Sequence, residues 1–162
     1  MRLNGSLPTW SLALLLAAGL PAACDDQRVF EDNHEFARRS WVMNDVPVFD
    51  FTIPDTIKTY NIYYNVRNSL DYRWRRINVT YALYDSTERE LAKKLVYHDL
   101  FDATGRPYGE SGLGDLYDHQ FSLLNTYQFP ARGKYSIRLT QFMRQDTLQG
   151  ILSVGVRVEQ NP

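Results

Sequence analysis

The chain has 162 residues, of which 44% are apolar, 14% aromatic and 23% charged. This length allows one ordinary globular domain, and the many aromatic residues exclude an intrinsically disordered protein. The formal net charge is −1, so the basic surface of a nucleic-acid-binding protein is not indicated. Cys24 is the single cysteine, which excludes a disulfide framework and an all-cysteine metal site.

Residues 1–23 have the composition of an export signal and are set apart from the fold. Their apolar run from Leu12 to Leu20 has nine residues, far fewer than the roughly 20 that span a bilayer. An ordinary secretory site needs small residues one and three positions before the cut, which no cut next to Ala23 provides. Small residues directly before Cys24 instead resemble a bacterial lipobox, with Pro21 where leucine is usual. We therefore expect Cys24 to be acylated; the alternative is a soluble secreted protein with a free thiol.

Residues 24–45 are predicted to be the lipidated cysteine followed by a charged tether. Eight of the 15 residues from Asp25 to Arg39 are charged, and only Val29-Phe30 offers a small apolar foothold. Several acyl chains hold a protein stably on a membrane, whereas one binds only marginally. The folded domain is predicted to span residues 46–162.

From Val46 onward, apolar and polar residues alternate with period two, as in strands with one buried face. Clear alternation covers residues 46–53, 59–67, 77–83, 135–140 and 152–158, with turn residues between them. Residues 88–100 are ambiguous, because Leu91 and Leu95 also lie one helical turn apart, and we predict a strand there. Seven or eight short strands with frequent turns predict an all-β protein, an antiparallel β-sandwich. Gly155 interrupts the last strand and indicates a bulge or a close approach of another segment.

The three histidines are candidates for catalytic residues or metal ligands. His98-Asp99 and Asp118-His119 have the residue types of acid–base pairs or metal ligands. The spacings H-x-H and H-x-x-x-H do not occur, and His34 stands alone. We expect surface or loop histidines, no catalytic residue and no cofactor.

The glycine-rich segment 105–115 invites a comparison with ligand-binding loops. A phosphate-binding loop would need a strand before it, a helix after it and a Lys-Ser/Thr pair, none of which is indicated. A calcium site could use acidic side chains around the segment, although the spacing of an EF-hand is missing. Those side chains are Asp99, Asp102, Glu110, Asp115 and Asp118. We expect an irregular loop that caps one end of the sandwich, with glycines at positive φ, and leave open whether it binds a ligand.

Two surface interpretations compete for the remaining aromatic and basic residues. Arginine and tryptophan are enriched at protein–protein hot spots, and both occur in two short clusters. The candidate interaction residues are Trp41, Arg73, Trp74, Arg75 and Arg76. In the alternative, a glycan-binding protein, aromatic rings would stack on sugars and form an exposed coplanar pair. The rings available for this are Tyr63, Tyr72, Trp74, Tyr84, Tyr108 and Tyr117.

A family resemblance extends across nearly the whole chain and rests on the order and spacing of short segments. These are Cys24–Phe30, Trp41, Val46–Phe51, Tyr60–Asn68, Asp71-Tyr72, Gly112–Asp115, Phe129, Gly133–Ile137, Gln141–Arg144, Gly150-Ile151 and Val154–Arg157. On these segments the chain resembles the GldH gliding-motility lipoproteins of the Bacteroidetes. The resemblance implies a membrane-anchored, non-catalytic envelope component whose partners are other motility proteins, and it carries over no active-site residue.

The implied lineage adds two expectations about export and modification. Asp25-Asp26 directly follow the cysteine, a pattern that can accompany surface exposure in this phylum, but we favour the interpretation that they belong to a charged tether. We expect an outer-membrane location and leave the exposed face open. Secreted proteins of these bacteria carry O-glycans on Ser or Thr after Asp and before an apolar residue or Thr. The matching candidates are Thr56, Ser86 and Thr147, although Asp, Ser and Thr also favour turns for structural reasons.

Overall fold

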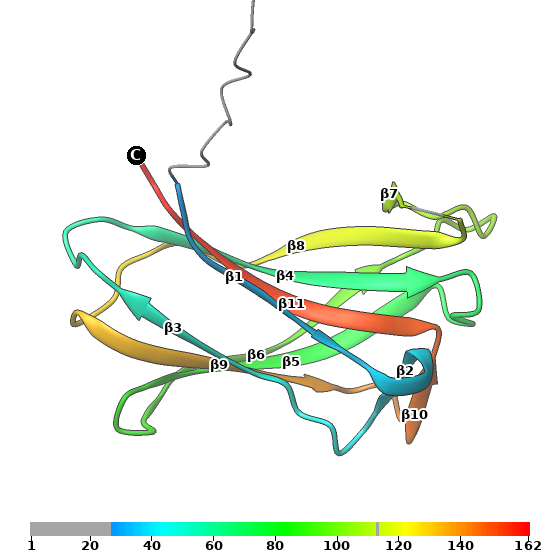
Figure 1. Ribbon diagram of the computed structural model, residues 1–162, viewed down its shortest axis with the longest axis horizontal. Helices are drawn as coiled ribbons and strands as arrows, with labels where there is room; N and C mark the ends of the chain where they lie inside the picture. Colours follow the sequence, from blue (N-terminus) through cyan, green and yellow to red (C-terminus); the bar gives the residue numbers. More distant parts are fainter. Residues whose placement is uncertain (1–26, 113) are drawn as a thin grey trace, which may run out of the picture.

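The computed structural model describes residues 27–112 and 114–162, which form a two-layer β-sandwich (Figure 1). The predicted signal peptide, residues 1–23, and the lipidation candidate Cys24 lie outside the described residues. Among the described residues are eleven strands, eight of them with six residues or more, and the short 3₁₀ turn η1 (Ala37–Arg39). The predicted antiparallel sandwich is confirmed, and the eight longer strands match the expected number.

Two main sheets form the layers, and all neighbouring strands are antiparallel. The larger sheet has the order β1 (Arg28–Glu35), β11 (Ile151–Gln160), β4 (Tyr60–Ser69), β8 (Leu116–Tyr127) and β7 (Glu110–Ser111). The smaller sheet has the order β3 (Val48–Ile53), β9 (Gly133–Gln141), β5 (Arg76–Asp85) and β6 (Glu90–Asp99). A separate ribbon pairs β2 (Ser40–Val42) with β10 (Thr147–Gln149).

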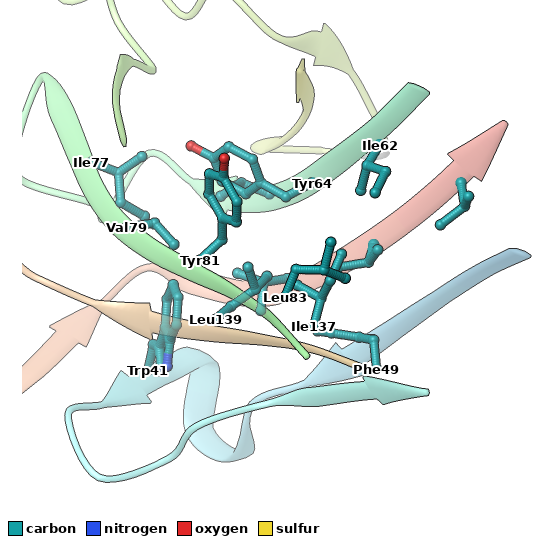
Figure 2. Close-up of a cluster of buried hydrophobic side chains, with 14 of the residues drawn as sticks. Trp41, Phe49, Ile62, Tyr64, Ile77, Val79, Tyr81, Leu83, Ile137 and Leu139 are labelled. Carbon is teal, nitrogen blue, oxygen red and sulfur yellow. The ribbon is translucent and has the colours of Figure 1, made fainter. Parts of the chain in front are cut away.

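The core lies between the two sheets and follows the predicted alternation. In β4, Tyr60, Ile62, Tyr64 and Val66 are buried, whereas the residues between them face outward. The same alternation buries one face of β5, β9 and β3, and Figure 2 shows side chains from these strands meeting those of β4. Each buried apolar side chain removes hydrocarbon from water, which stabilises the face-to-face packing of the sheets.

Two segments with weak sequence signals also form strands. Glu90–Asp99 is strand β6, so the prediction of a strand at residues 88–100 is confirmed. It lies at the edge of its sheet, where one face is partly solvated, and this explains its mixed pattern. Strand β8 is irregularly periodic because its register with β4 shifts near Ile62 and Thr126 has a positive φ of 53°.

The predicted tether is wrong for most of its length. Arg28–Glu35 is strand β1, which pairs with β11 along its length, so the sandwich begins at residue 28 rather than at residue 46. An edge strand needs only one paired neighbour and tolerates charges on its solvated face, so its charged composition does not prevent strand formation. On the other face, Phe30 packs against Phe51 with ring centroids 5.7 Å apart.

The sandwich has two distinct ends, and the start of the described chain lies at one of them. Gln160 donates its backbone N–H to the carbonyl of Gln27, and Gln160 also pairs with Tyr60 at the start of β4. Strands β1 and β4 run away from this end together (Figure 1). The loop after Ser69 therefore lies at the far end, and we call this the distal end.

Candidate functional site

The outer side of the smaller sheet carries exposed apolar side chains among polar ones. The register places Lys93, Ala82, Arg138 and Val48 in one row across β6, β5, β9 and β3. Nearer the distal end, Leu95 lies opposite Thr80 and Tyr97 lies opposite Asn78. Five large apolar side chains on or beside these rows are 38–63% exposed. They are Val46, Val48, Leu95, Tyr97 and Phe142, and together they define the apolar face.

The position of the apolar face follows from strand pairing. Phe142 follows β9 and donates its backbone N–H to the carbonyl of Asn78 at 2.8 Å, which brings its side chain beside the Tyr97 row. Val46 lies in the loop two residues before β3 and is 38% exposed. Exposed apolar side chains on one side of a sheet can serve as anchors in a protein contact.

Cationic groups border the apolar face and cover aromatic rings. The guanidinium of Arg138 lies 4.4 Å from the ring centroid of Tyr84, and that of Arg76 lies 5.3 Å from the ring centroid of Tyr97. Arg138 also pairs with the carboxylate of Glu88. These stacked guanidiniums combine planar surface with hydrogen-bond donors, a combination suited to protein contacts.

The predicted cluster of Arg73, Trp74, Arg75 and Arg76 lies at the distal end, next to the apolar face. Arg75 and Arg76 donate to the two carboxylate oxygens of Asp99 at 2.8 and 2.7 Å. The hydrogen bond from Arg76 is the main reason that the pKa of Asp99 lies below its ordinary value. Trp74 is half-buried against Tyr72, with ring centroids 5.7 Å apart, and Arg73 is exposed. Thus the structure brings these four residues together near one surface.

Trp41 does not belong to that surface. Its side chain is fully buried, stacks on Phe36 at 5.1 Å and donates its indole N–H to the carbonyl of Asp45 at 2.8 Å. The prediction of Trp41 as an exposed interaction residue is therefore wrong. Strand β2, on which it lies, pairs with β10 and directs this ring into the core.

The two histidine–aspartate neighbours point to opposite faces of their strands. His98 faces the core and shares a 2.8 Å hydrogen bond with the hydroxyl of Tyr64, whereas Asp99 binds the two arginines outside. His119 is buried, with Nε2 2.9 Å from Oδ1 of Asn68. Burial lowers the pKa of both imidazoles below the ordinary value. Neither pair can act as a linked acid and base.

His34 lies apart from these two histidines. Its Nε2 is 3.4 Å from the carboxylate of Asp45, and its ring meets the edge of Phe36 with centroids 5.0 Å apart. The side chain is about 41% exposed. His34 thus lies near the surface, as the sequence predicted.

The carboxylates considered for calcium are largely engaged within the chain. Asp99 binds arginines, Asp118 binds Arg67, and Asp102 accepts hydrogen bonds from Thr104 and from the backbone of Arg106. Glu110 and Asp115 are exposed. Within residues 27–112 and 114–162, no three His, Cys, Asp or Glu side chains are arranged to hold a metal ion.

The glycine-rich segment 105–115 lies against the edge of the larger sheet. Gly105 and Gly114 have φ of 83° and 75°, which confirms the expected positive φ at these two positions. Glu110-Ser111 pairs with Asp118-Tyr117 as strand β7, so the segment is more ordered than the predicted irregular loop.

The six aromatic residues considered for glycan stacking do not form the expected exposed coplanar pair. Tyr72 is buried, and Tyr108 is 65% exposed. The other four, Tyr63, Trp74, Tyr84 and Tyr117, are half-buried. Among these residues the structure contains no aromatic platform.

The O-glycosylation candidates lie at or beside turns. Ser86 is exposed in the turn between β5 and β6, and Thr56 is half-buried in the loop between β3 and β4. Thr147 is exposed but begins β10, opposite Val42, rather than lying between strands as predicted.

Comparison with known proteins identifies the family. Residues 28–158 match the profile described as GldH lipoprotein, which covers most of the chain. The chain belongs to the GldH lipoprotein family. The match begins with β1 and ends within β11, so the family profile coincides with the β-sandwich.

Two curated relatives agree with this assignment. Gliding motility lipoprotein GldH of Flavobacterium johnsoniae is 29% identical over 154 residues, covering 91% of this chain and 94% of the relative. A GldH homolog of Christiangramia forsetii is 28% identical over 152 residues, covering 86% and 88%. The predicted family resemblance is therefore confirmed.

Solved structures give weaker similarities. The VP2 subviral particle of infectious bursal disease virus matches with a TM-score of 0.40 and 14% identity, over 83% of this chain and 33% of the viral chain. Latent PorU of Porphyromonas gingivalis matches with a TM-score of 0.38 and 5% identity, over 83% of this chain and 13% of PorU.

In the described part of this chain, no helix has the length and hydropathy of a membrane span.

The apolar face was missed in the sequence. Its signal was present at residues 88–100, where Leu95 and Tyr97 are apolar residues at outward positions of the strand, next to Lys93.

Proposed function

We propose that this chain is a non-catalytic, lipid-anchored binding component of the gliding-motility machinery that contacts another envelope protein through the apolar face. The observation that carries the proposal is the group of exposed Val46, Val48, Leu95, Tyr97 and Phe142 on one side of one sheet. Burying such side chains against a partner stabilises a complex, since each removes apolar surface from water. The family assignment supplies the cellular context.

The geometry of anchoring supports the same proposal. If Cys24 is acylated, the membrane lies three residues before Gln27, at the end opposite the arginine–tryptophan cluster. Tyr97 and Phe142 lie toward that distal end, because Asn78, which pairs with both segments, is near the start of β5. A partner approaching from the side away from the membrane would reach the apolar face first.

The binding proposal is tested by crosslinking in cells. A photoreactive amino acid replaces Leu95 or Phe142 in the chain's own chromosomal gene, with Ser122 on the outer face of the larger sheet as the matched control position. We expect a defined adduct with one envelope protein from the first two positions and none from Ser122. Equal adducts from all three positions, or none from the first two, would contradict the proposal.

Charged substitutions give a functional readout of the same surface. Leu95→Glu and Phe142→Glu should reduce colony spreading while the protein remains at its normal level, because a buried unpaired carboxylate weakens the contact. Ser122→Glu should spread like the parent strain. Normal spreading of both apolar-face variants would reject the proposed surface.

We also propose that the anchor is Cys24 and that the protein resides in the outer membrane. Cys24→Ser should leave the precursor uncleaved and without lipid, so no processed species should enter the detergent phase in Triton X-114 partitioning. A processed variant that still enters the detergent phase would reject the lipobox. Membrane fractionation tests the location, and protease treatment of intact cells decides the face, since full protection excludes surface display.

A further inference from the structure

The outer face of the larger sheet carries a regular array of polar side chains. Strand alternation turns the valines of β11 inward, together with Tyr64 and Val66 of β4. The residues between them face outward. Three outward rows cross β1, β11, β4 and β8. They are Glu31–Arg157–Tyr63–Ser122, Asn33–Gly155–Asn65–Gln120 and Glu35–Ser153–Arg67–Asp118. The second and third rows, with Glu31 of the first, border the cleft described below, and Ser122 lies outside it.

Gly155, in the middle of this array, contributes no side chain, and the side chain of Asn33 lies over it. A Cβ atom at Gly155 would lie 2.6 Å from the carbonyl oxygen of Asp32 and 2.8 Å from Cγ of Asn33, so only glycine fits. The close approach predicted from the sequence at this position is thereby confirmed. A cleft of about 590 Å³ opens over this face and is lined from all four strands, a volume typical of small-ligand sites.

The glycine-rich segment forms one wall of the cleft. Tyr108, Gly109 and Glu110 line it together with His119 of β8. A Cβ atom at Gly109 would lie 2.7 Å from the carbonyl oxygen of Asp118 and 2.7 Å from Nε2 of His119. Glycine at this position therefore allows the segment to lie directly against β8, next to His119.

Hydrogen bonds between the side chains hold the array in a defined arrangement. Gln120 donates to Oδ1 of Asn65 at 3.1 Å, and Asn65 donates to Oε1 of Glu31 at 3.4 Å. Arg67 binds both carboxylate oxygens of Asp118, at 2.7 and 3.1 Å. Side chains that are already ordered lose less entropy when a ligand binds, which favours affinity.

The chemistry of the array selects the class of ligand. Asn33, Asn65 and Gln120 are uncharged, and each amide offers both donors and an acceptor, which suits the hydroxyl groups of a sugar. The carboxylates that line the cleft are Glu31, Glu35, Glu110 and Asp118. Glu31 pairs with Arg28 and Arg157, and Asp118 pairs with Arg67. Glu35 and Glu110 therefore make the lining acidic, which disfavours an anionic ligand. The 65% exposed ring of Tyr108 at the wall provides a flat apolar surface beside these amides.

We propose that this cleft binds an uncharged oligosaccharide through the row of amides, with the ring of Tyr108 against one sugar face. The site lies on the sheet opposite the apolar face and is independent of the proposed protein contact. It differs from the aromatic platform expected from the sequence, because hydrogen-bonding side chains rather than paired rings form its floor.

The test uses the full-length lipoprotein in a detergent without sugar headgroups. Isothermal titration calorimetry measures binding of hexamers of glucose, mannose, xylose and N-acetylglucosamine. A hexamer of galacturonic acid and a lysine-rich hexapeptide serve as charged comparators. We expect saturable binding of at least one uncharged hexamer and weaker binding of both comparators.

Variants then locate the site. Asn65→Ala and Gln120→Ala should each weaken binding of that hexamer about tenfold, as expected for the loss of one or two hydrogen bonds, and Tyr108→Ala should also weaken it. Thr140→Ala, on the outer face of the other sheet, is the control and should bind like the parent. Thermal unfolding should be unchanged in all four, since these side chains lie at the surface.

Three outcomes would overturn the proposal. They are no saturable binding of any uncharged hexamer, tighter binding of a charged comparator, and binding that Asn65→Ala and Gln120→Ala leave unchanged. None of these results bears on crosslinking from Leu95 or Phe142, so failure here is distinguishable from failure of the proposed function.

Discussion

The ring of His98 stacks on the ring of Phe121, with centroids 4.1 Å apart and planes 10° from parallel. His98 belongs to β6 of the smaller sheet and Phe121 to β8 of the larger one, so this contact joins the two layers. His119 lies near the same ring, with centroids 5.7 Å apart. These two histidines are packing residues, and their burial has a consequence for stability.

Stability should decrease as the pH falls from 7 to 5. Burial lowers the pKa of His98 and His119 in the folded chain, so the unfolded chain binds protons more readily in this range. The contribution is complete above the unfolded pKa, near 6.5, and is lost as the pH falls toward the folded values. Urea denaturation at a series of pH values measures the free energy of unfolding.

Variants of the stack separate this effect from other titrations. The double variant His98→Phe, His119→Gln should show a flatter profile between pH 7 and 5. Tyr64→Phe should keep the parent profile, because burial rather than the tyrosine hydrogen bond is the main cause of the lowered pKa of His98. An unchanged slope in the double variant would show that other groups are responsible.

Gly150→Ala should be strongly destabilising. Gly150 has φ of 84°, and a Cβ atom there would lie 2.8 Å from Cα of Tyr72 and closer still to its backbone nitrogen. Since backbone cannot move aside as a flexible side chain can, we expect a loss of about 3 kcal/mol or more in unfolding free energy. Denaturant unfolding provides the measurement.

Gly105→Ala is the matched control for this substitution. Gly105 has nearly the same φ, 83°, but no atom lies within 4 Å of its Cβ position. The loss of unfolding free energy in Gly105→Ala should reflect backbone strain alone and amount to about 1–2 kcal/mol. Equal losses in the two variants would show that the contact with Tyr72 contributes nothing.

Trp41→Ala should lower the free energy of unfolding by about 3–5 kcal/mol, because it leaves a cavity at a fully buried site in the core. Trp74→Ala should cost about 1 kcal/mol, since its ring is only half-buried at the distal end. Thermal and urea unfolding of both variants tests the distinction. A small loss of unfolding free energy in Trp41→Ala would contradict the core role of this residue.

O-glycosylation is expected at one or more of Thr56, Ser86 and Thr147, with Ser86 the most accessible candidate because it is exposed in a turn. Intact-mass spectrometry of the native lipoprotein should show mass beyond lipid and polypeptide. Alanine at the modified position should remove that mass, whereas Ser122→Ala, which lacks a preceding aspartate, should not. A mass equal to lipid plus bare polypeptide would reject the modification.

The sequence by itself determined the fold class and the inward face of most strands. In β4, β5 and β9, the apolar residues that alternate in the sequence are those that are buried. This succeeds because alternation is a local property: successive side chains of a strand point to opposite sides whatever its neighbours are. The family resemblance was likewise carried by the order of segments along the chain, and the family profile confirms it.

Only the tertiary structure decided what the strands place side by side. Asn33, Asn65, Gln120 and Gly155 are far apart in the sequence, yet strand register sets them in one row. In the same way, pairing with β11 made the charged segment Arg28–Glu35 a strand, and pairing of β2 with β10 placed Trp41 in the core. Register and edge position depend on contacts between distant segments, which local alternation does not specify.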